Sequence, residues 1–216
     1  MAPEPADELD LGAKLARAID GYRATWRTVD AELYDLCRRR PSQRIFADVY
    51  AKVAVIGRVY VAGVSRSSHA PGDREAEVAR GLIGLADLIE ETLADLAGRQ
   101  FDRATAAQIV ELHGRVTRGL LPHTGDVWLP SFVSKYLHFH CDRVPIYDSN
   151  AASVIGCFVD RRLVADVRAL MTDVPVCALA YRKFVAAFVV LQERINAETS
   201  VAATVKEVDH LLWQSA

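Results

Sequence analysis

The 216-residue sequence is poor in cysteine and in long apolar segments. Its four cysteines, Cys37, Cys141, Cys157 and Cys177, include no C-x-x-C pair. The sequence therefore lacks the usual spacing of a cysteine-ligated zinc ion or an iron–sulfur cluster, and we expect reduced thiols, mostly in the core. The longest apolar run, Phe184 to Leu191, is far shorter than the ~18 residues that a membrane-spanning helix needs.

An excess of positive charge is also absent. The chain has 26 Lys and Arg residues against 28 Asp and Glu residues, which gives a net charge of −2. Binding of nucleic acid through bulk charge is therefore excluded, and only a local basic patch remains as a route to DNA. The N-terminal MAPEPADELDLG is acidic and lacks the basic and then apolar pattern of a secretory signal. We expect a cytoplasmic protein with no membrane partner.

Apolar residues recur at spacings of three and four along most of the chain, which is the period of an amphipathic helix. The pattern predicts five long helices, within residues 11–36, 46–64, 82–96, 109–120 and 181–195. No comparable segment alternates with a period of two, so we expect no sheet larger than a small ribbon. The length favours one domain over two. The sequence thus predicts a single all-α domain over residues 1–216, with about eight or nine helices.

Several side chains predict where helices begin. Pro41 suits the first position of the second helix, because its missing N–H would be unpaired there in any case. Asp73 ends the clearest loop, residues 67–73, and is a good N-cap. Thr105 with Gln108 and Thr204 with Glu207 have the spacing of capping boxes. The segment LPHTGDVWLP, residues 121–130, is expected to be irregular, and residues 131–139 to form a short helix.

The segment WLPSFVSKYLHFHCDRVPIYDSNAA, residues 128–152, contains most of the residues that suggest chemistry. Asp148 follows an apolar approach and precedes a run of small residues. It is expected to cap the helix that follows, which stabilises a helix by about 1 kcal/mol. A carboxylate fixed at a helix start beside a cleft can also orient a nucleophile or stabilise a developing cation. The two roles are compatible.

Lys135 lies in a strongly apolar part of this segment. One interpretation is a lysine whose alkyl stem lies along the core and whose ammonium reaches water. The other is an amine in a cleft, where burial lowers the pKa of the lysine and makes its nitrogen a nucleophile.

His138, His140 and Cys141 are residue types that bind metal ions. Helix positions two apart do not share a face and no third ligand follows, so we expect no metal and no other cofactor.

Arg38, Arg39, Arg40 and Arg44 form the one basic cluster of note. Such a run is usually a solvated turn that complements a helix C-terminus. The alternative is a set of contacts to nucleic-acid phosphates.

The motif SFVSKYLHFHCDRVPIYDSNAA resembles the lysine-to-aspartate region of the helix-hairpin-helix DNA glycosylase superfamily. The resemblance is greatest to divergent bacterial proteins with an 8-oxoguanine glycosylase fold, and it extends to AKVAVIGRVYVAGV (residues 51–64) and VKEVDHLLWQ (residues 205–214). Together these stretches cover about a quarter of the chain. The resemblance implies a helix-hairpin-helix fold and base excision from DNA. It also implies that Asp148 is the catalytic aspartate and that Lys135 forms a Schiff base with the sugar. The family's glycine-rich hairpin is replaced here by residues 121–125, Leu-Pro-His-Thr-Gly.

Three functional hypotheses follow. The first is an enzyme that acts on a base flipped out of DNA, because the chemistry is sterically blocked inside a duplex. In that case the expected substrate contacts are Trp128, Phe132, Tyr136, His138 and Tyr147, with the first three able to stack on the base. The second is a non-catalytic α-helical binding module with the same fold, in a bacterial defence or regulatory context. The third is an enzyme that acts on a small molecule.

Overall fold

The computed structural model describes residues 10–64, 73–171 and 175–216. Within these ranges 74% of the residues are helical and none forms a strand, which confirms the all-α prediction. Two segments discussed above lie outside the described residues: most of the N-terminal stretch and the loop before Asp73. None of the helices in the described ranges combines the length and apolar character of a bilayer-spanning segment.

The helices of the described residues are more numerous than the eight or nine that the sequence predicted. Two 3₁₀ turns, Ile155–Cys157 and Val176–Ala178, accompany them. The α-helices are α1 (Leu11–Ala24), α2 (Arg27–Arg39), α3 (Phe46–Val59), α4 (Arg74–Ile83), α5 (Ala86–Leu96), α6 (Arg103–Gly119), α7 (Leu121–Thr124), α8 (Pro130–His140), α9 (Ser149–Val154), α10 (Arg161–Ala169), α11 (Leu179–Glu198) and α12 (Val205–Gln214).

The first predicted helix is two helices, because the chain breaks at Thr25 and Trp26 between α1 and α2. The break changes which side of the chain faces the core. Val29, one of the apolar residues at the helical spacing within residues 11–36, is 38% exposed, whereas its neighbour Asp30 is fully buried. The spacing of three and four was continued across the break, and it therefore placed Val29 in the interior in place of Asp30. The third predicted helix divides in the same way, at Gly84 and Leu85 between α4 and α5.

Most of the predicted helix starts are confirmed. The carboxylate of Asp73 accepts the N–H of Ala76, and Thr204 forms a capping box with Glu207. Two starts differ from the prediction. The N-cap of α6 is Asp102, with Thr105 as the third residue of its capping box, because the aspartate is the better acceptor at that end.

Pro41 does not begin a helix. The segment 41–45 is irregular, and α3 begins at Phe46. The segment expected to be irregular, residues 121–130, contains the short helix α7, which ends at Gly125 in a left-handed conformation. The short helix expected over residues 131–139 is confirmed as α8.

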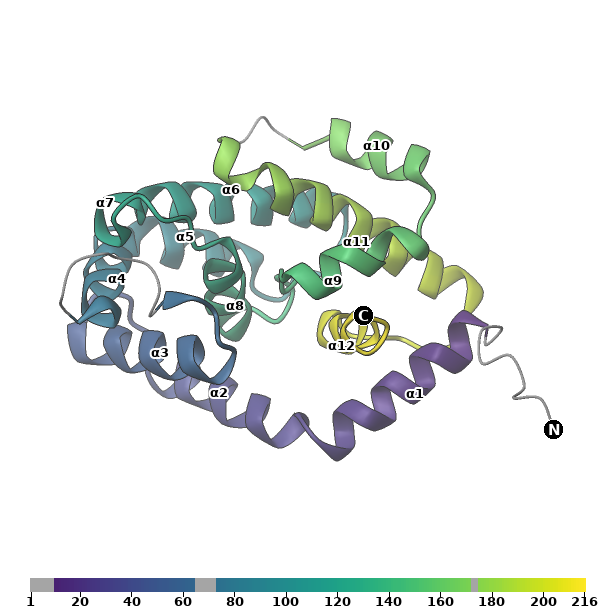
Figure 1. The fold of residues 1–216 in the computed structure, drawn as a ribbon, viewed down its shortest axis with the longest axis horizontal. Helices are drawn as coiled ribbons and strands as arrows, with labels where there is room; N and C mark the ends of the chain where they lie inside the picture. Colours follow the sequence, from purple (N-terminus) through teal and green to yellow (C-terminus); the bar gives the residue numbers. More distant parts are fainter. Residues whose placement is uncertain (1–9, 65–72, 172–174) are drawn as a thin grey trace.

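Helix α8 is the centre of the fold. Every residue from Phe132 to Phe139 is buried, as expected for a helix covered on all sides. It packs against α2, α3 and α6, and α12 packs against α1 and α9. Figure 1 shows α12 viewed end-on and surrounded by other helices. Helix α10 lies on the outside, next to α11. The buried apolar residues form one contiguous cluster.

Candidate functional site

Lys135 points into the protein. The residue is only 4% exposed, and its Nζ donates a hydrogen bond to Oγ of Ser131, 3.0 Å away. The Nζ also lies 5.5 Å from the centroid of the Tyr60 ring. Burial lowers the pKa of Lys135, an effect that the negative charges of Asp148 and Asp209 partly offset. The lysine is thus an interior amine and not one that reaches bulk water.

The chain between α8 and α9 is held so that Asp148 returns towards Lys135. Ser134 Oγ accepts the backbone N–H of Tyr147 at 3.0 Å, and Nδ1 of His138 bonds the carbonyl oxygen of Val144 at 2.7 Å. These two anchors are one helical turn apart on α8, on either side of Lys135. Asp148 is the N-cap of α9, and its Oδ1 accepts the N–H of Ala151 at 2.8 Å. The capping role predicted from the sequence is confirmed.

A second lysine, which the sequence analysis missed, lies in the same region. Lys206 on α12 is buried, and its Nζ lies 3.1 Å from Oδ2 of Asp209 and 3.4 Å from Oδ2 of Asp30. It also donates to the hydroxyl of Tyr60 at 3.0 Å, and that hydroxyl donates to Asp30. Burial alone would lower the pKa of Lys206, but the two carboxylates outweigh it and the pKa is raised.

A third buried lysine, Lys52 on α3, has a structural role. Its Nζ donates to the carbonyl oxygens of Arg40 and Ser42, at 2.9 and 3.0 Å, and so holds the irregular segment after α2. Of the three buried lysines, only Lys135 combines a lowered pKa, nearby carboxylates and a single hydrogen bond among the described residues. An ammonium has three donors, so one hydrogen bond leaves the charged form poorly satisfied.

Tyr34 and His138 complete this polar region. The two side chains are joined by a hydrogen bond of 2.5 Å between the tyrosine hydroxyl and Nε2 of the histidine. Nδ1 donates to the carbonyl of Val144, so in the neutral ring Nε2 accepts the tyrosine proton. Burial, with the positive charge of Lys206, lowers the pKa of His138 to about 3. The histidine therefore stays uncharged at neutral pH and acts as a fixed connection between α2 and α8.

The aromatic residues expected to contact a base occupy different environments. Phe132 and Tyr136 are fully buried, and Tyr136 donates its hydroxyl proton to the side chain of Gln43. Tyr147 is half-buried and packs edge-on against Phe184, with ring centroids 5.4 Å apart. Trp128 is 42% exposed. Of these four rings, Trp128 is the most accessible from solvent.

The four arginines of the basic cluster are all exposed, and each has an acidic partner. Arg38 and Arg39 pair with Asp35, Arg40 pairs with Asp48, and Arg44 pairs with Asp87 and Glu90. A phosphate would have to displace these carboxylates before it could be bound.

A larger concentration of cations surrounds a cavity of about 880 Å³ between α1, α2, α8 and α12. Its lining includes Tyr34 and Lys206 of the buried polar region. Five basic and two acidic side chains line it: Arg23, Arg27, Arg38, Arg143, Lys206, Asp142 and Glu207. Four of these five cations have acidic partners: Arg23 pairs with Glu207, Arg38 with Asp35, Arg143 with Asp142, and Lys206 with Asp30 and Asp209. Most of the positive charge around the cavity is therefore already paired, as it is in the predicted arginine cluster.

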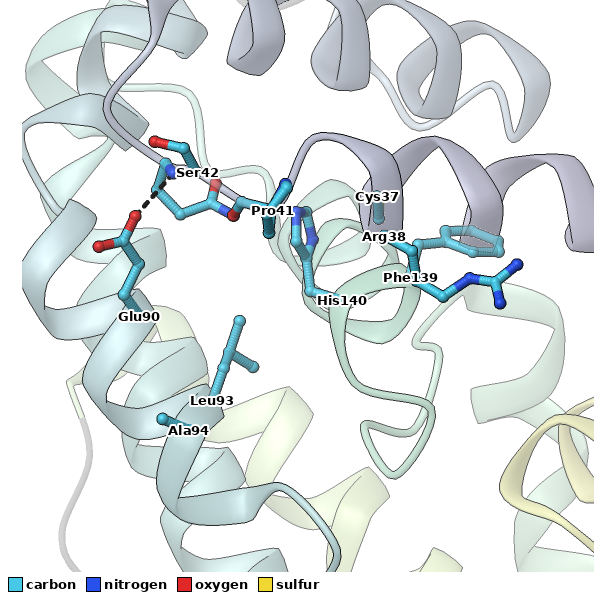
Figure 2. Close-up of a pocket in the computed structure, with 10 residues that line it drawn as sticks. Cys37, Arg38, Pro41, Ser42, Glu90, Leu93, Ala94, Phe139 and His140 are labelled. Atoms are coloured by element: carbon cyan, nitrogen blue, oxygen red, sulfur yellow. Dashed lines mark hydrogen bonds between the residues drawn. The ribbon is translucent and has the colours of Figure 1, made fainter.

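A neighbouring cavity of about 630 Å³ shares His140, Phe139, Leu93 and Arg38 with the first. Figure 2 shows His140 between Leu93 and Pro41. The carboxylate of Glu90 accepts the backbone N–H of Gln43, with 2.8 Å between the two atoms. Nδ1 of His140 bonds the carbonyl of Tyr136, and burial lowers the pKa of His140 to about 3. Neither Lys135 nor Asp148 lines either cavity.

In the described part of the chain, no group of three or more His, Cys, Asp or Glu side chains is arranged to hold a metal ion. Cys37, Cys141 and Cys157 are free thiols. Of these three, Cys37 is buried, Cys141 is partly buried and Cys157 is exposed. The expectation of mostly core cysteines is therefore wrong for the described side chains. Cys141 and Cys157 lie in less covered segments on either side of α9.

The sequence analysis missed Asp30, Lys206 and Asp209 because each occupies a position on the buried side of an otherwise amphipathic helix. A signal was present in the sequence: Lys206 and Asp209 are spaced three apart among the apolar residues Val205, Val208, Leu211 and Leu212. Polar residues at this spacing share a helix face, so their occurrence within an apolar stripe indicates a buried pair.

No family model, curated protein sequence or solved structure matches this chain.

Proposed function

We propose that this chain is a DNA glycosylase-like enzyme that removes a flipped-out base, with Lys135 as the amine nucleophile and Asp148 as its carboxylate partner. One observation carries the proposal. Lys135 is a buried amine with a lowered pKa and one hydrogen bond, and Asp148 lies close enough to interact with it electrostatically. Desolvation of a lysine, which lowers its pKa, is a recognised means of activating an amine nucleophile, and the fixed carboxylate of Asp148 is available to accept a proton.

The proposed reaction uses the neutral form of Lys135. Its nitrogen lone pair attacks C1′ of the sugar, and the bond between C1′ and the base breaks. The base leaves with the bonding electron pair and takes up a proton. Asp148 stabilises the positive charge that develops on the sugar and accepts the proton that the attacking nitrogen loses. The nitrogen lone pair then forms the C1′=N bond as the C1′–O4′ bond breaks, and O4′ takes up the proton held by Asp148. The product is a ring-opened, protonated Schiff base between Lys135 and C1′.

The electrostatics of the two central lysines support this assignment of roles. Lys206 is held between two carboxylates that raise its pKa, so it remains a cation. That cation lowers the pKa of Lys135. Neighbouring cations are one of the recognised means by which a lysine is kept neutral for attack.

Trp128, the most accessible of the predicted aromatic contacts, is the proposed stacking residue for the base.

The proposal is tested by base release from short duplexes that each carry one damaged or mismatched base. We expect wild-type protein to release the base from at least one duplex and Lys135→Met to release none. Lys135→Met should fold, because it removes a poorly satisfied buried charge. Trp128→Ala serves as a test of stacking and should weaken substrate binding.

Two results would overturn the proposal. The first is base release by Lys135→Met at the wild-type rate. The second is duplex binding without release by the wild-type protein across the panel, which would favour the alternative of a non-catalytic binding module.

A further inference from the structure

A third cavity, of about 670 Å³, lies between α9, α10 and α11. Neither Lys135 nor Asp148 lines it. Its volume is within the range typical of small-molecule sites, which is about 300–1,000 Å³. Its apolar surface combines the rings of Tyr147 and Phe184 with small and aliphatic side chains, among them Ala152, Ile155, Val164 and Ala187. Figure 1 shows α10 on the outside of the molecule, where it covers α11.

The charges around this cavity are all of one sign. Arg161, Arg168 and Lys183 line it, and no acidic side chain does. These three cations have no carboxylate partner within ion-pair distance in the described part of the chain. The contrast with Arg38, Arg39, Arg40 and Arg44 is informative, because each of those arginines has an acidic partner.

Three unpaired cations around an aliphatic surface, in a chain of net charge −2, define an unusual local environment. An apolar molecule gains from contact with the small side chains, and an anionic group gains from the three cations. Either feature alone is common on protein surfaces. Together they select a molecule that carries both an aliphatic body and a negative head.

We propose that this cavity binds a small amphiphile with an aliphatic chain and an anionic head, such as a medium-chain carboxylate. The chain lies on the alanine- and valine-lined surface, and the head lies among Arg161, Arg168 and Lys183. This inference does not depend on the proposed glycosylase activity, because Lys135, Asp148 and Trp128 do not line the cavity; of the expected base contacts, Tyr147 does.

Isothermal titration calorimetry with decanoate tests the proposal, with decanol and decyltrimethylammonium as neutral and cationic probes of the same chain length. We expect decanoate to bind with a one-to-one stoichiometry, and the other two to bind at least tenfold more weakly. The double variant Arg161→Gln/Arg168→Gln should raise the Kd for decanoate at least tenfold. Ala165→Trp should do the same by filling the cavity. Arg162→Gln is the matched control, because Arg162 neighbours Arg161 on α10 but does not line the cavity, and its Kd should not change.

The same variants distinguish a free ligand from a membrane surface. Vesicles of neutral phosphatidylcholine with and without anionic phosphatidylglycerol serve as the second probe. Binding to anionic vesicles without one-to-one binding of decanoate would overturn the proposal in favour of a lipid surface. Equal affinity for decanoate and decanol, or an unchanged Kd in both Arg161→Gln/Arg168→Gln and Ala165→Trp, would overturn it as well.

Discussion

Lys206 and Asp209 form an ion pair on α12, with 3.1 Å between Nζ and Oδ2, and both side chains are buried. Asp30 also lies 3.4 Å from the same ammonium, so one cation faces two carboxylates. Removal of the lysine would leave two carboxylates facing one another in the interior. Asp30, Lys206 and Asp209 therefore form a buried set in which each charge is stabilised by an opposite charge of the set.

We predict that Lys206→Met lowers the free energy of unfolding by about 3–5 kcal/mol, because it leaves buried carboxylates without a partner. Urea unfolding monitored by circular dichroism measures this change. The control is Arg115→Met, which breaks an exposed ion pair with Glu111 and should cost less than about 1 kcal/mol. Similar costs for the two variants would show that the buried group is not a coupled set.

His138 should make the protein sensitive to acid. Its pKa is about 3 in the folded state and about 6.5 in an unfolded chain, so the unfolded state gains a proton first as the pH falls. A depressed folded-state pKa means that stability is fully present above about pH 6.5 and is lost as the pH falls towards 3. The expected loss from this residue between pH 7 and pH 5 is about 2 kcal/mol.

The measurement is the free energy of unfolding at pH 7 and at pH 5, for wild type and for His138→Gln. Buried His113 and His140 remain in the variant, so the difference between the two pH dependences isolates His138. An identical pH dependence in both proteins would contradict the prediction.

Asp148→Asn separates capping from catalysis. Asn and Asp cap helices about equally well, so the free energy of unfolding should change by no more than a few tenths of a kcal/mol. The melting temperature should therefore be nearly unchanged. A lost electrostatic contact in the transition state is worth about 3 kcal/mol, which is a decrease in rate of about 100-fold or more. The substitution also removes a negative charge that raises the pKa of Lys135, so the pH profile of any residual activity should move to lower pH. Near-equal melting with full activity would leave Asp148 as a cap alone.

DNA binding should depend only weakly on salt. Each phosphate neutralised contributes about −0.9 to the slope of log K against log salt, so four arginines would give at most about −3.6. Arg38, Arg39, Arg40 and Arg44 already have acidic partners, and we therefore expect a slope shallower than this limit. Fluorescence anisotropy between 50 and 200 mM salt provides the slope. A steeper value would locate the phosphate contacts elsewhere, with the cavity lined by Arg23, Arg27 and Arg143 as the next candidate.

The sequence predicted the all-α class and most of the longer helices, but it did not predict α7 or α10. It also identified the segment that contains Lys135 and Asp148. Periodicity worked best where the helix was uninterrupted, as in α6 and α11. It failed at Thr25–Trp26, where no Gly or Pro marks the break, and this error placed Val29 inside and Asp30 outside. A break of this kind depends on how α1 and α2 pack, which local sequence does not specify.

The candidate site was only partly predictable for a related reason. Lys135 and Asp148 are 13 residues apart, so a local motif contains them both. Asp30, Tyr60 and Lys206 come from α2, from the end of α3 and from α12, and only the tertiary fold brings them together. The arginine cluster shows the opposite error. Its charge was evident in the sequence, but its acidic partners Asp48, Asp87 and Glu90 lie on other helices.

Borohydride trapping tests the central claim most directly. A Schiff base between an amine and C1′ is reduced to a stable secondary amine, and peptide mass mapping identifies the lysine that carries the adduct. With a cleavable duplex we predict an adduct on Lys135 and none on Lys52 or Lys206, with a yield that rises with pH through a midpoint below the ordinary value of about 10.4. An adduct on another lysine, or base release with no adduct on Lys135, would contradict the account.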